Sequence, residues 1–155
     1  MIEGKLVNLR AYEPTDAAAW TRWYNDSEAI EHLSWRYPFS LEAEEAFLQD
    51  RTSTLPGYAN VLFAIETKEG EHIGGINFNQ TYVESRKARL GITIGDKAYW
   101  SKGYGSDALV TLLRFGFAEM NLHRIELDVY AFNERARASY RKCRPRQDVS
   151  GSPRR

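Results

Sequence analysis

A glycine-containing turn carries the residues whose types and spacing best suit chemistry. Residues 99–106 read Tyr-Trp-Ser-Lys-Gly-Tyr-Gly-Ser and precede a stretch with the apolar spacing of a helix. A helix N-terminus presents unpaired N–H groups and a partial positive charge, and glycine lets an anion approach the backbone. The pattern predicts a phosphate-binding turn, although a Gly-x-Gly also serves as a purely structural tight turn.

The strand expected before this turn has one face with few bulky side chains. Alternate residues of a strand point to opposite faces, so one face of residues 88–94 and the position after it carries Arg89, Gly91, Thr93 and Gly95. A long thin ligand can lie against such a face. A bulge, or a bend required by sheet packing, produces the same pattern, so both interpretations stay open here.

A dinucleotide-binding site is an alternative for the same glycines. Residues 103–108 read Gly-Tyr-Gly-Ser-Asp-Ala, and Glu126 and Asp128 lie where a ribose-binding acid belongs. In that fold, however, the glycines follow their strand directly and lie near the start of the chain. Here residues 95–102 intervene, and too few residues follow Tyr130 for the further strands and helices. The context therefore argues against a nicotinamide enzyme.

Hydrophobic periodicity predicts the elements that must position the turn. Alternating patterns predict strands, and apolar residues three and four apart predict helices. The expected strands are residues 5–11, 61–66, 73–79, 88–94 and 124–130, and the expected helices begin after Thr15 or Asp16, after Ser40 and near Ser106. The second helix is expected to bury Ala46, Phe47 and Leu48. The strand, helix and strand at the turn imply a parallel pair with a right-handed crossover, joined to a mostly antiparallel sheet, in a mixed α/β (α+β) fold.

Size and composition restrict the class of protein. A chain of 155 residues with a hydrophobic fraction of 43% is long enough for one globular domain. Lys+Arg and Asp+Glu both count 21, so no overall field attracts nucleic acid or an anionic membrane. Cys143 has no partner for an intramolecular disulfide, and residues 1–10 lack a signal-peptide pattern. We expect a cytoplasmic protein, with no metal ion.

Several ordered motifs together resemble the GNAT superfamily of acyl-CoA-dependent N-acyltransferases. Within it, the chain is similar to the ribosomal-protein-alanine and spermidine N-acetyltransferases. The resemblance covers residues 6–143, and its most specific parts are residues 90–96, 99–105, 122–127, 133–136 and 140–143. It implies the GNAT fold, acetyl-CoA (coenzyme A) as the cofactor and an amine as the acceptor.

The resemblance also assigns cofactor-binding residues. Backbone N–H groups of the turn would hold the CoA pyrophosphate, from Trp100, Ser101, Lys102, Gly103, Tyr104, Gly105 and Ser106. The preceding strand would hydrogen-bond the pantetheine arm through Ile92, Thr93 and Ile94, and Asn133 would contact the same arm. Trp100 stands where the family has Arg or Gln, which backbone donors make tolerable.

The same resemblance assigns catalytic roles. Tyr140 matches the tyrosine that protonates the departing thiolate, which is reasonable because a phenol of pKa about 10 and a CoA thiolate have comparable basicity. Attack also requires a neutral amine and hence a base or an ordered water. We rank Glu84 first, with Glu66 and Asp128 as other acids near strand ends, because Arg89 stands where the subgroup often has Glu.

An aromatic loop is where this subgroup receives its acceptor, and here it contains Trp35, Tyr37 and Phe39. Ordinary packing between two helices also accounts for such residues. The acceptor can be a protein N-terminus, a polyamine or a small-molecule amine.

The pattern breaks after Cys143. The family continues with Gly-Phe and two further strands, whereas residues 144–155 are polar, basic and rich in Pro, Gly and Ser. We expect residues 1–143 to form an incomplete GNAT domain and 144–155 a disordered tail, after a truncation or frameshift. An exposed sheet edge would then favour a homodimer, and catalysis could be impaired, leaving a module that binds CoA without turnover.

Overall fold

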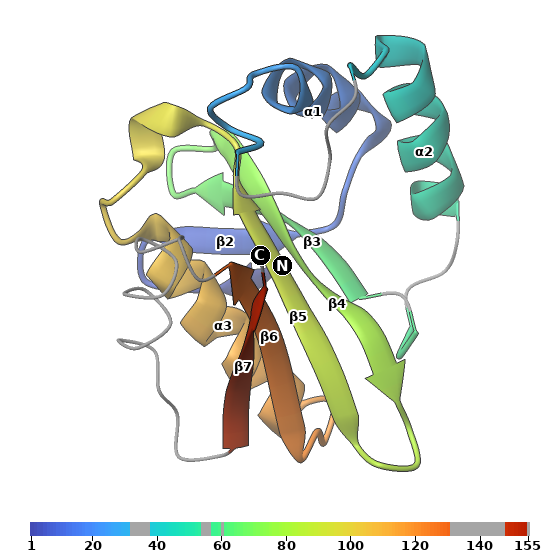
Figure 1. The fold of residues 1–155 in the computed structure, drawn as a ribbon, viewed down its shortest axis with the longest axis vertical. Helices are drawn as coiled ribbons and strands as arrows, with labels where there is room; N and C mark the ends of the chain where they lie inside the picture. The colour runs from blue at the N-terminus through green and yellow to red at the C-terminus, as the bar shows by residue number, and fades with distance from the viewer. Residues whose placement is uncertain (32–37, 54–56, 60, 131–147, 155) are drawn as a thin grey trace.

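A computed structural model describes the backbone of residues 1–31, 38–53, 57–59, 61–130 and 148–154, and the side chains up to residue 127 within those ranges (Figure 1). The elements are β1 Ile2–Glu3, β2 Val7–Arg10, η1 Pro14–Asp16, α1 Ala17–Tyr24, α2 Leu41–Ser53, β3 Val61–Thr67, β4 His72–Tyr82, β5 Lys87–Ile94, η2 Lys97–Tyr99, α3 Tyr104–Ala118, β6 Arg124–Tyr130 and β7 Asp148–Arg154. Among these, no helix is long and apolar enough to cross a membrane.

The described strands form one mixed sheet in sequential order from β1 to β7. Each pair from β1 to β5 is antiparallel, and β6 is parallel to β5, as a helix-containing crossover requires. The crossover helix is α3. The mixed α/β architecture and the five strands expected from periodicity are therefore confirmed, and β1 is an addition that two residues could not reveal.

Two hydrophobic clusters cover the two faces of the sheet. The larger one packs α3 against the strands through residues such as Leu109, Leu112 and Ile125. The smaller one, which we call the aromatic cluster, comprises Tyr12, Ala17, Trp20, Trp23, Leu48 and Ala64. Figure 1 accordingly shows α1 and α2 together at one end of the molecule and α3 apart from them.

The second helix differs from its prediction. Ser40 Oγ accepts a hydrogen bond from the Ala43 N–H at 3.0 Å, so the predicted cap is present. The buried residues of α2 are Glu44 and Leu48, whereas Phe47 is exposed. The prediction that Ala46 and Phe47 are buried is wrong. The buried face of α2 instead contains Glu44 and Leu48, which are four residues apart and therefore lie on the same side of the helix.

The chain after Cys143 also differs from expectation where the structure describes it. Residues 148–154 form β7, which lies parallel to β6 with Arg124 opposite Asp148. Strand pairing uses backbone groups, so a free strand edge on β6 can be covered by a segment without a hydrophobic period. Residues 131–147 lie outside the described residues, and the expected loss of two family strands and a homodimer stay predictions.

Candidate active site

The central feature of the site is a gap in the parallel pairing of β5 and β6. Their register runs from Lys87 opposite Arg124 to Leu90 opposite Leu127 and then stops, although β5 continues to Ile94. Residues 91–94 keep their antiparallel partners in β4 on the other side. We call the unpaired side of residues 91–94 the open edge. Within the described part of the chain, no strand satisfies its backbone groups.

The register shows which backbone groups face the open edge. Gly95 N–H, just beyond the end of β5, donates to the Ile73 carbonyl at 2.9 Å, so the N–H of this residue faces β4. In an antiparallel ladder, hydrogen-bonded and non-hydrogen-bonded pairs alternate. The amides of Thr93 therefore face β4, while those of Ile92 and Ile94 face the open edge. This is the geometry needed to hydrogen-bond an extended ligand along β5.

The turn after β5 brings a helix N-terminus toward this edge. Ser101 has φ 58° and Gly103 has φ 90°, so the chain turns through two left-handed residues. Gly103 is the N-cap of α3, which begins at Tyr104, two residues earlier than predicted. A Cβ on Gly105 would lie 3.5 Å from Ile94, so the first turn of α3 packs on the end of β5. The result is a set of N–H groups and a helix dipole at the end of the open edge.

Trp100 fastens the turn to the strand. Its indole Nε1–H donates to the Ile94 carbonyl at 2.7 Å, which satisfies one backbone group that faces the open edge. Tyr99 and Tyr104 pack edge to face behind the turn, with ring centroids 5.1 Å apart. Sequence reasoning assigned Trp100 only a backbone role, so this side-chain contact was missed.

Asp107 is an acidic residue in the first turn of α3, the helix whose N-terminus is the candidate phosphate site. It accepts backbone N–H donors from Lys5 at 3.1 Å, Leu6 at 2.7 Å and Val7 at 3.0 Å. Three such donors satisfy the negative charge and hold the β1–β2 connection against α3. Gly4 is required there, because a Cβ would lie 2.5 Å from the Asp107 carboxylate. No sequence signal other than an acid in the first helical turn pointed to this arrangement.

Two lysines flank the turn and differ in their partners. Lys97 Nζ is 2.9 Å from Asp26 and 3.0 Å from Glu28, and these hydrogen bonds raise its pKa above the ordinary value. Lys102 is exposed, and no described residue forms an ion pair with it. Lys102 is thus the cation beside the turn that is available to a ligand phosphate.

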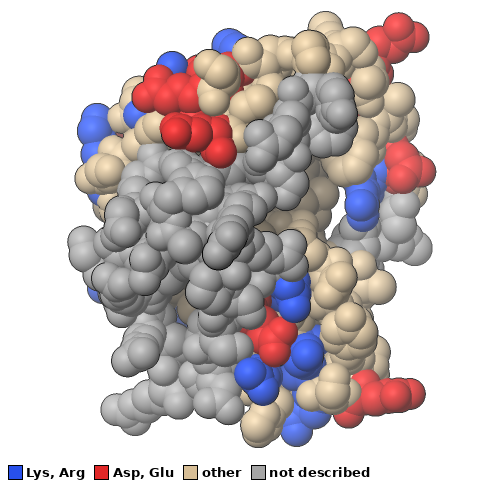
Figure 2. Space-filling view, viewed as in Figure 1, with Lys and Arg blue, Asp and Glu red and all other residues tan. Residues whose placement is uncertain are grey.

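Charges elsewhere on the sheet neutralise one another. Glu126 on β6 lies 3.5 Å from Lys87, 3.5 Å from Arg89 and 3.4 Å from Arg124. Figure 2 shows basic and acidic side chains side by side on the lower part of the drawn face, without a patch of one sign. Arg89 therefore pairs with an acid of β6.

The aromatic cluster lies on the face of β4 and β5 opposite α3. A Cβ on Gly75 would collide with Tyr12 and Trp20, and a Cβ on Gly95 would collide with Trp23. Both glycines are needed for this close approach of rings to the sheet. Because Gly75 is paired with Thr93, the rings cover the sheet immediately beside the open edge.

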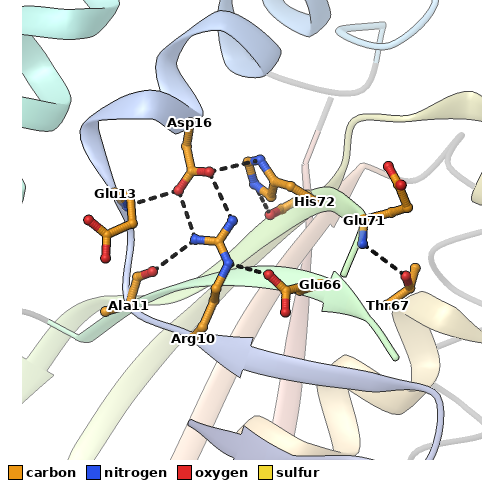
Figure 3. A network of polar contacts seen from close by, with 9 residues as sticks. Arg10, Ala11, Glu13, Asp16, Glu66, Thr67, Glu71 and His72 are labelled. Atoms are coloured by element: carbon orange, nitrogen blue, oxygen red, sulfur yellow. Dashed lines mark hydrogen bonds and ion pairs between the residues drawn. The ribbon is translucent and has the colours of Figure 1, made fainter. Parts of the chain in front are cut away.

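A buried polar network holds α1 and its aromatic side chains on the sheet (Figure 3). Arg10 donates to Asp16 Oδ1 and Oδ2, both at 2.9 Å, and to Glu66 Oε2 at 2.6 Å. Asp16 also accepts the Glu13 N–H at 2.9 Å and lies 3.4 Å from His72 Nδ1. The network thereby links β2, β3 and β4 to the start of α1.

The network shifts the pKa values of its members. Burial alone would raise the pKa of Asp16, but hydrogen bonds from Arg10 and Glu13 outweigh it and lower that pKa. The hydrogen bond to Asp16 raises the pKa of Arg10. Burial against Trp20 and Trp23 lowers the pKa of His72, although Asp16 opposes this shift. Glu66 is occupied by Arg10, so it does not offer a free base.

The structure separates Glu84 from the open edge. Glu84 is exposed in the turn between β4 and β5, before the first residue of β5. At about 3.4 Å per residue, Lys87 and Ile92 alone are about 17 Å apart. A general base must lie within hydrogen-bond reach of the proton, directly or through one water. If the amine reacts beside Ile92, Glu84 does not reach it.

Other predicted site residues fall partly outside the described residues. These are Asn133, Tyr140, Trp35, Tyr37 and the side chain of Asp128. Phe39 is described: its ring lies 5.2 Å from Tyr24, and Asn25 hydrogen-bonds both its N–H and its carbonyl. It therefore packs beside the aromatic cluster, on the same side of the sheet as the glycine face of β5.

Known proteins are similar to this chain in sequence and in fold. The family model described as "Acetyltransferase (GNAT) domain" matches residues 7–144. A relative named uncharacterized N-acetyltransferase p20, from Bacillus licheniformis, is 30% identical over 125 residues, which are 79% of this chain and 69% of the relative.

Solved structures agree in fold. A GNAT-family acetyltransferase from Bacillus anthracis has a TM-score of 0.77 at 24% identity and covers 92% of this chain and 81% of its own. Spermidine N-acetyltransferase from Vibrio cholerae, solved with CoA and spermine, has a TM-score of 0.75 at 23% identity, covering 89% and 79%. With most of its length matched by the family model, the chain belongs to the GNAT acetyltransferase family.

Proposed function

We propose that this protein transfers the acetyl group of acetyl-CoA to a primary amine, by direct attack in a ternary complex. The observation that carries the proposal is the open edge, where β5 continues beyond its last pair with β6 and ends beneath the N-terminus of α3. One end of this groove of backbone donors suits a diphosphate, and the strand suits the extended arm that follows it.

The residues of the 100–106 turn fit the diphosphate of CoA. Their side chains matter less than their N–H groups, since an anion is bound here by backbone donors and the helix dipole. The exposed Lys102 can add a point charge. Asp107 does not repel the anion strongly, because three backbone donors already satisfy its carboxylate.

The chemistry requires few side chains. The lone pair of the neutral amine attacks the thioester carbonyl carbon, the C–S bond breaks, and the sulfur leaves as a thiolate. The Ile92 N–H faces the open edge, where it can stabilise the developing oxyanion. By its resemblance to the family tyrosine, Tyr140 donates the proton that the thiolate takes up. The amine proton passes to a base or to an ordered water.

The acceptor approaches from the face that carries the aromatic cluster. On this side Trp23 packs on Gly95, Asn77 and Asn79 lie beside Gly91, and the Phe39 ring lies next to Tyr24. Trp35 and Tyr37 belong to the same loop in sequence and are proposed to contact the acceptor. A protein N-terminus, a polyamine or a small-molecule amine fits this arrangement.

Release of free thiol from acetyl-CoA, measured with a panel of amines and checked by intact mass, tests the proposal. Tyr140→Phe is expected to lower kcat by roughly 100-fold or more, with the Kd of CoA unchanged, because one proton transfer is lost. Tyr82→Phe is the matched control, since Tyr82 is exposed and distant in sequence from the site. CoA binding without acceptor-dependent thiol release would refute the enzymatic function and leave a binding module.

The role of Glu84 has a separate test. Glu84→Gln is expected to leave the rate within about twofold, because the side chain lies beyond the reach of a general base. A loss as large as that of Tyr140→Phe would instead reinstate Glu84 as the base and would show that the amine reacts near the β4–β5 turn.

A further inference from the structure

Two asparagine side chains lie beside Gly91, on the face of β5 from which the acceptor is proposed to approach. Asn77 of β4 is paired with Gly91 in the antiparallel register. A Cβ on Gly91 would lie 2.9 Å from Asn77 Oδ1 and 2.9 Å from Asn79 Nδ2. The two carboxamides therefore occupy the space that a side chain at position 91 would fill. That space adjoins Ile92, the residue whose N–H faces the open edge.

A β-bulge in β4 brings the second asparagine to this position. Phe78 belongs to the core that packs against α3, so its neighbours Asn77 and Asn79 point to the opposite face. The register shifts after Phe78, so Gln80 and not Asn79 lies opposite Arg89. Bulges redirect side chains in this way next to binding sites. Here Asn77 Nδ2 donates to Asn79 Oδ1 at 2.5 Å, which leaves Asn77 Oδ1 and Asn79 Nδ2 turned toward position 91.

The pair is accessible and has hydrogen-bonding capacity left. Asn79 is exposed, and Asn77 and Gly91 are half-buried, so a ligand on this face reaches the pair from solvent. Within the described ranges, no residue hydrogen-bonds Asn77 Oδ1 or Asn79 Nδ2. By contrast, the carboxylates of Glu66 and Glu126 are already paired with cations. The carboxamides are thus polar groups beside the reacting position that a ligand can still use.

We infer that Asn77 Oδ1 accepts a hydrogen bond from the attacking amine, and that Asn79 holds the Asn77 carboxamide in place. This role rests on the proposed function and deepens it, because it names the group that orients the amine. The amine must be neutral to attack, and a carboxamide accepts its N–H without stabilising the unreactive ammonium form, as a carboxylate would.

The hydrogen bond strengthens during the reaction. As the C–N bond forms and the C–S bond breaks, the amine nitrogen becomes positively charged, and its N–H groups become stronger donors to Asn77. The nitrogen then gives one proton to water, and the thiolate takes up the proton of Tyr140. An interaction that is stronger in the transition state than in the ground state raises the rate of the chemical step.

Steady-state kinetics of amine-dependent thiol release tests the role of Asn77. Asn77→Leu and Asn77→Asp both keep the size of the side chain, but only Asn77→Asp keeps an oxygen that can accept the amine N–H. We expect Asn77→Leu to lower kcat/KM for the amine by about tenfold, and Asn77→Asp to keep at least about a third of the wild-type value. Asn8→Leu is the matched control and should not change it. Asn8 is a half-buried asparagine of β2 whose side chain accepts one hydrogen bond, from Lys68.

A double-mutant cycle tests the positioning role of Asn79. Asn79→Ala should lower kcat/KM by about threefold, and the double variant Asn77→Leu/Asn79→Ala should lose no more than Asn77→Leu alone, because Asn79 acts through Asn77. The KM for acetyl-CoA, the Kd of CoA and the circular dichroism spectrum should stay unchanged in every variant, since backbone groups hold the cofactor.

Each other outcome overturns a stated part of the proposal. Wild-type kcat/KM in Asn77→Leu, or equal losses in Asn77→Leu and Asn77→Asp, would overturn the role of Asn77. Additive losses in the double variant would overturn the positioning role of Asn79. Absence of thiol release with every amine in the wild type would instead overturn the proposed function, and the role of the pair with it.

Discussion

One side of the candidate site consists of backbone groups and the other side consists of side chains. The open edge and the 100–106 turn consist of backbone groups, held by two left-handed residues and by Trp100. The aromatic cluster and its polar network consist of side chains, several of them buried and charged. Backbone donors bind a ligand whatever side chains surround them, whereas a buried charge is stable only with its partner. Substitutions in the aromatic cluster and its polar network, which together we call the acceptor side, should therefore lower the free energy of unfolding most. Substitutions at the 100–106 turn should lower the affinity for the cofactor most.

Removing Arg10 is expected to have the largest effect on stability. In Arg10→Met, the carboxylates of Asp16 and Glu66, which are 7% and 18% exposed in the native structure, lose their shared cation. The free energy of unfolding in urea at pH 7 should fall by about 3 kcal/mol, the cost of breaking a buried ion pair. Arg22→Met, on the exposed face of α1, is the control and should change it by less than about 0.5 kcal/mol. A loss similar in both variants would show that the network does not fasten α1 to the sheet.

Glu44 is expected to make the free energy of unfolding depend on pH. Its folded-state pKa of about 6 lies above the ordinary 4.5, so ionisation is easier in the unfolded chain. Stability should therefore fall as the pH rises from about 4.5 to 6. Without ligand, the unfolding free energy of the wild type relative to Glu44→Gln should drop by about 2 kcal/mol between pH 4 and pH 7.5.

The comparison with Glu44→Gln isolates this group. His72 has a lowered pKa and Asp16 also titrates in acid, but both occur in the two proteins and cancel in the difference. A difference that does not vary with pH would mean that Glu44 has an ordinary pKa in the folded state.

The turn could be predicted from the sequence because its function resides in residue types with strong local signatures. Gly103 and Gly105 mark the turn, and the alternation around Gly91 marks the strand that precedes it. The parallel crossover followed from element order, and the structure confirms it. The point at which β5 and β6 separate was not predictable, because pairing depends on tertiary contacts that no local pattern encodes.

The buried residues and contacts of the acceptor side could largely not be predicted from the sequence. Glu44 was assigned to the start of a helix, and nothing in the spacing of acids distinguishes it from Glu42 and Glu45. Only its position four residues before Leu48 gave a signal, and that signal competes with the usual preference of glutamate for the surface. The partners of Arg10 lie on three other elements, so the network depends on the assembled sheet.

Gly103→Ala should distinguish strain from ligand binding at the turn. The left-handed conformation, φ 90°, makes any side chain there unfavourable by about 1 kcal/mol. Gly70 has φ 93° with open space around it, so Gly70→Ala is a control with the same strain away from the site. Both variants should lose similar stability, but only Gly103→Ala should weaken CoA binding by calorimetry. Equal CoA affinities in the two variants would remove the turn from the cofactor site.

The smallest expected effect distinguishes backbone from side-chain recognition at the turn itself. Lys102→Met removes an exposed charge that no described residue neutralises, whereas Lys97→Met removes one already paired with Asp26 and Glu28. Since an exposed ion pair contributes about 0.5 kcal/mol, Lys102→Met should raise the Kd of CoA about twofold to threefold at low salt. Screening should abolish that difference near 1 M salt, and Lys97→Met should bind as the wild type does. A loss of tenfold or more in Lys102→Met would mean that a side chain, and not the N–H groups of α3, dominates diphosphate binding.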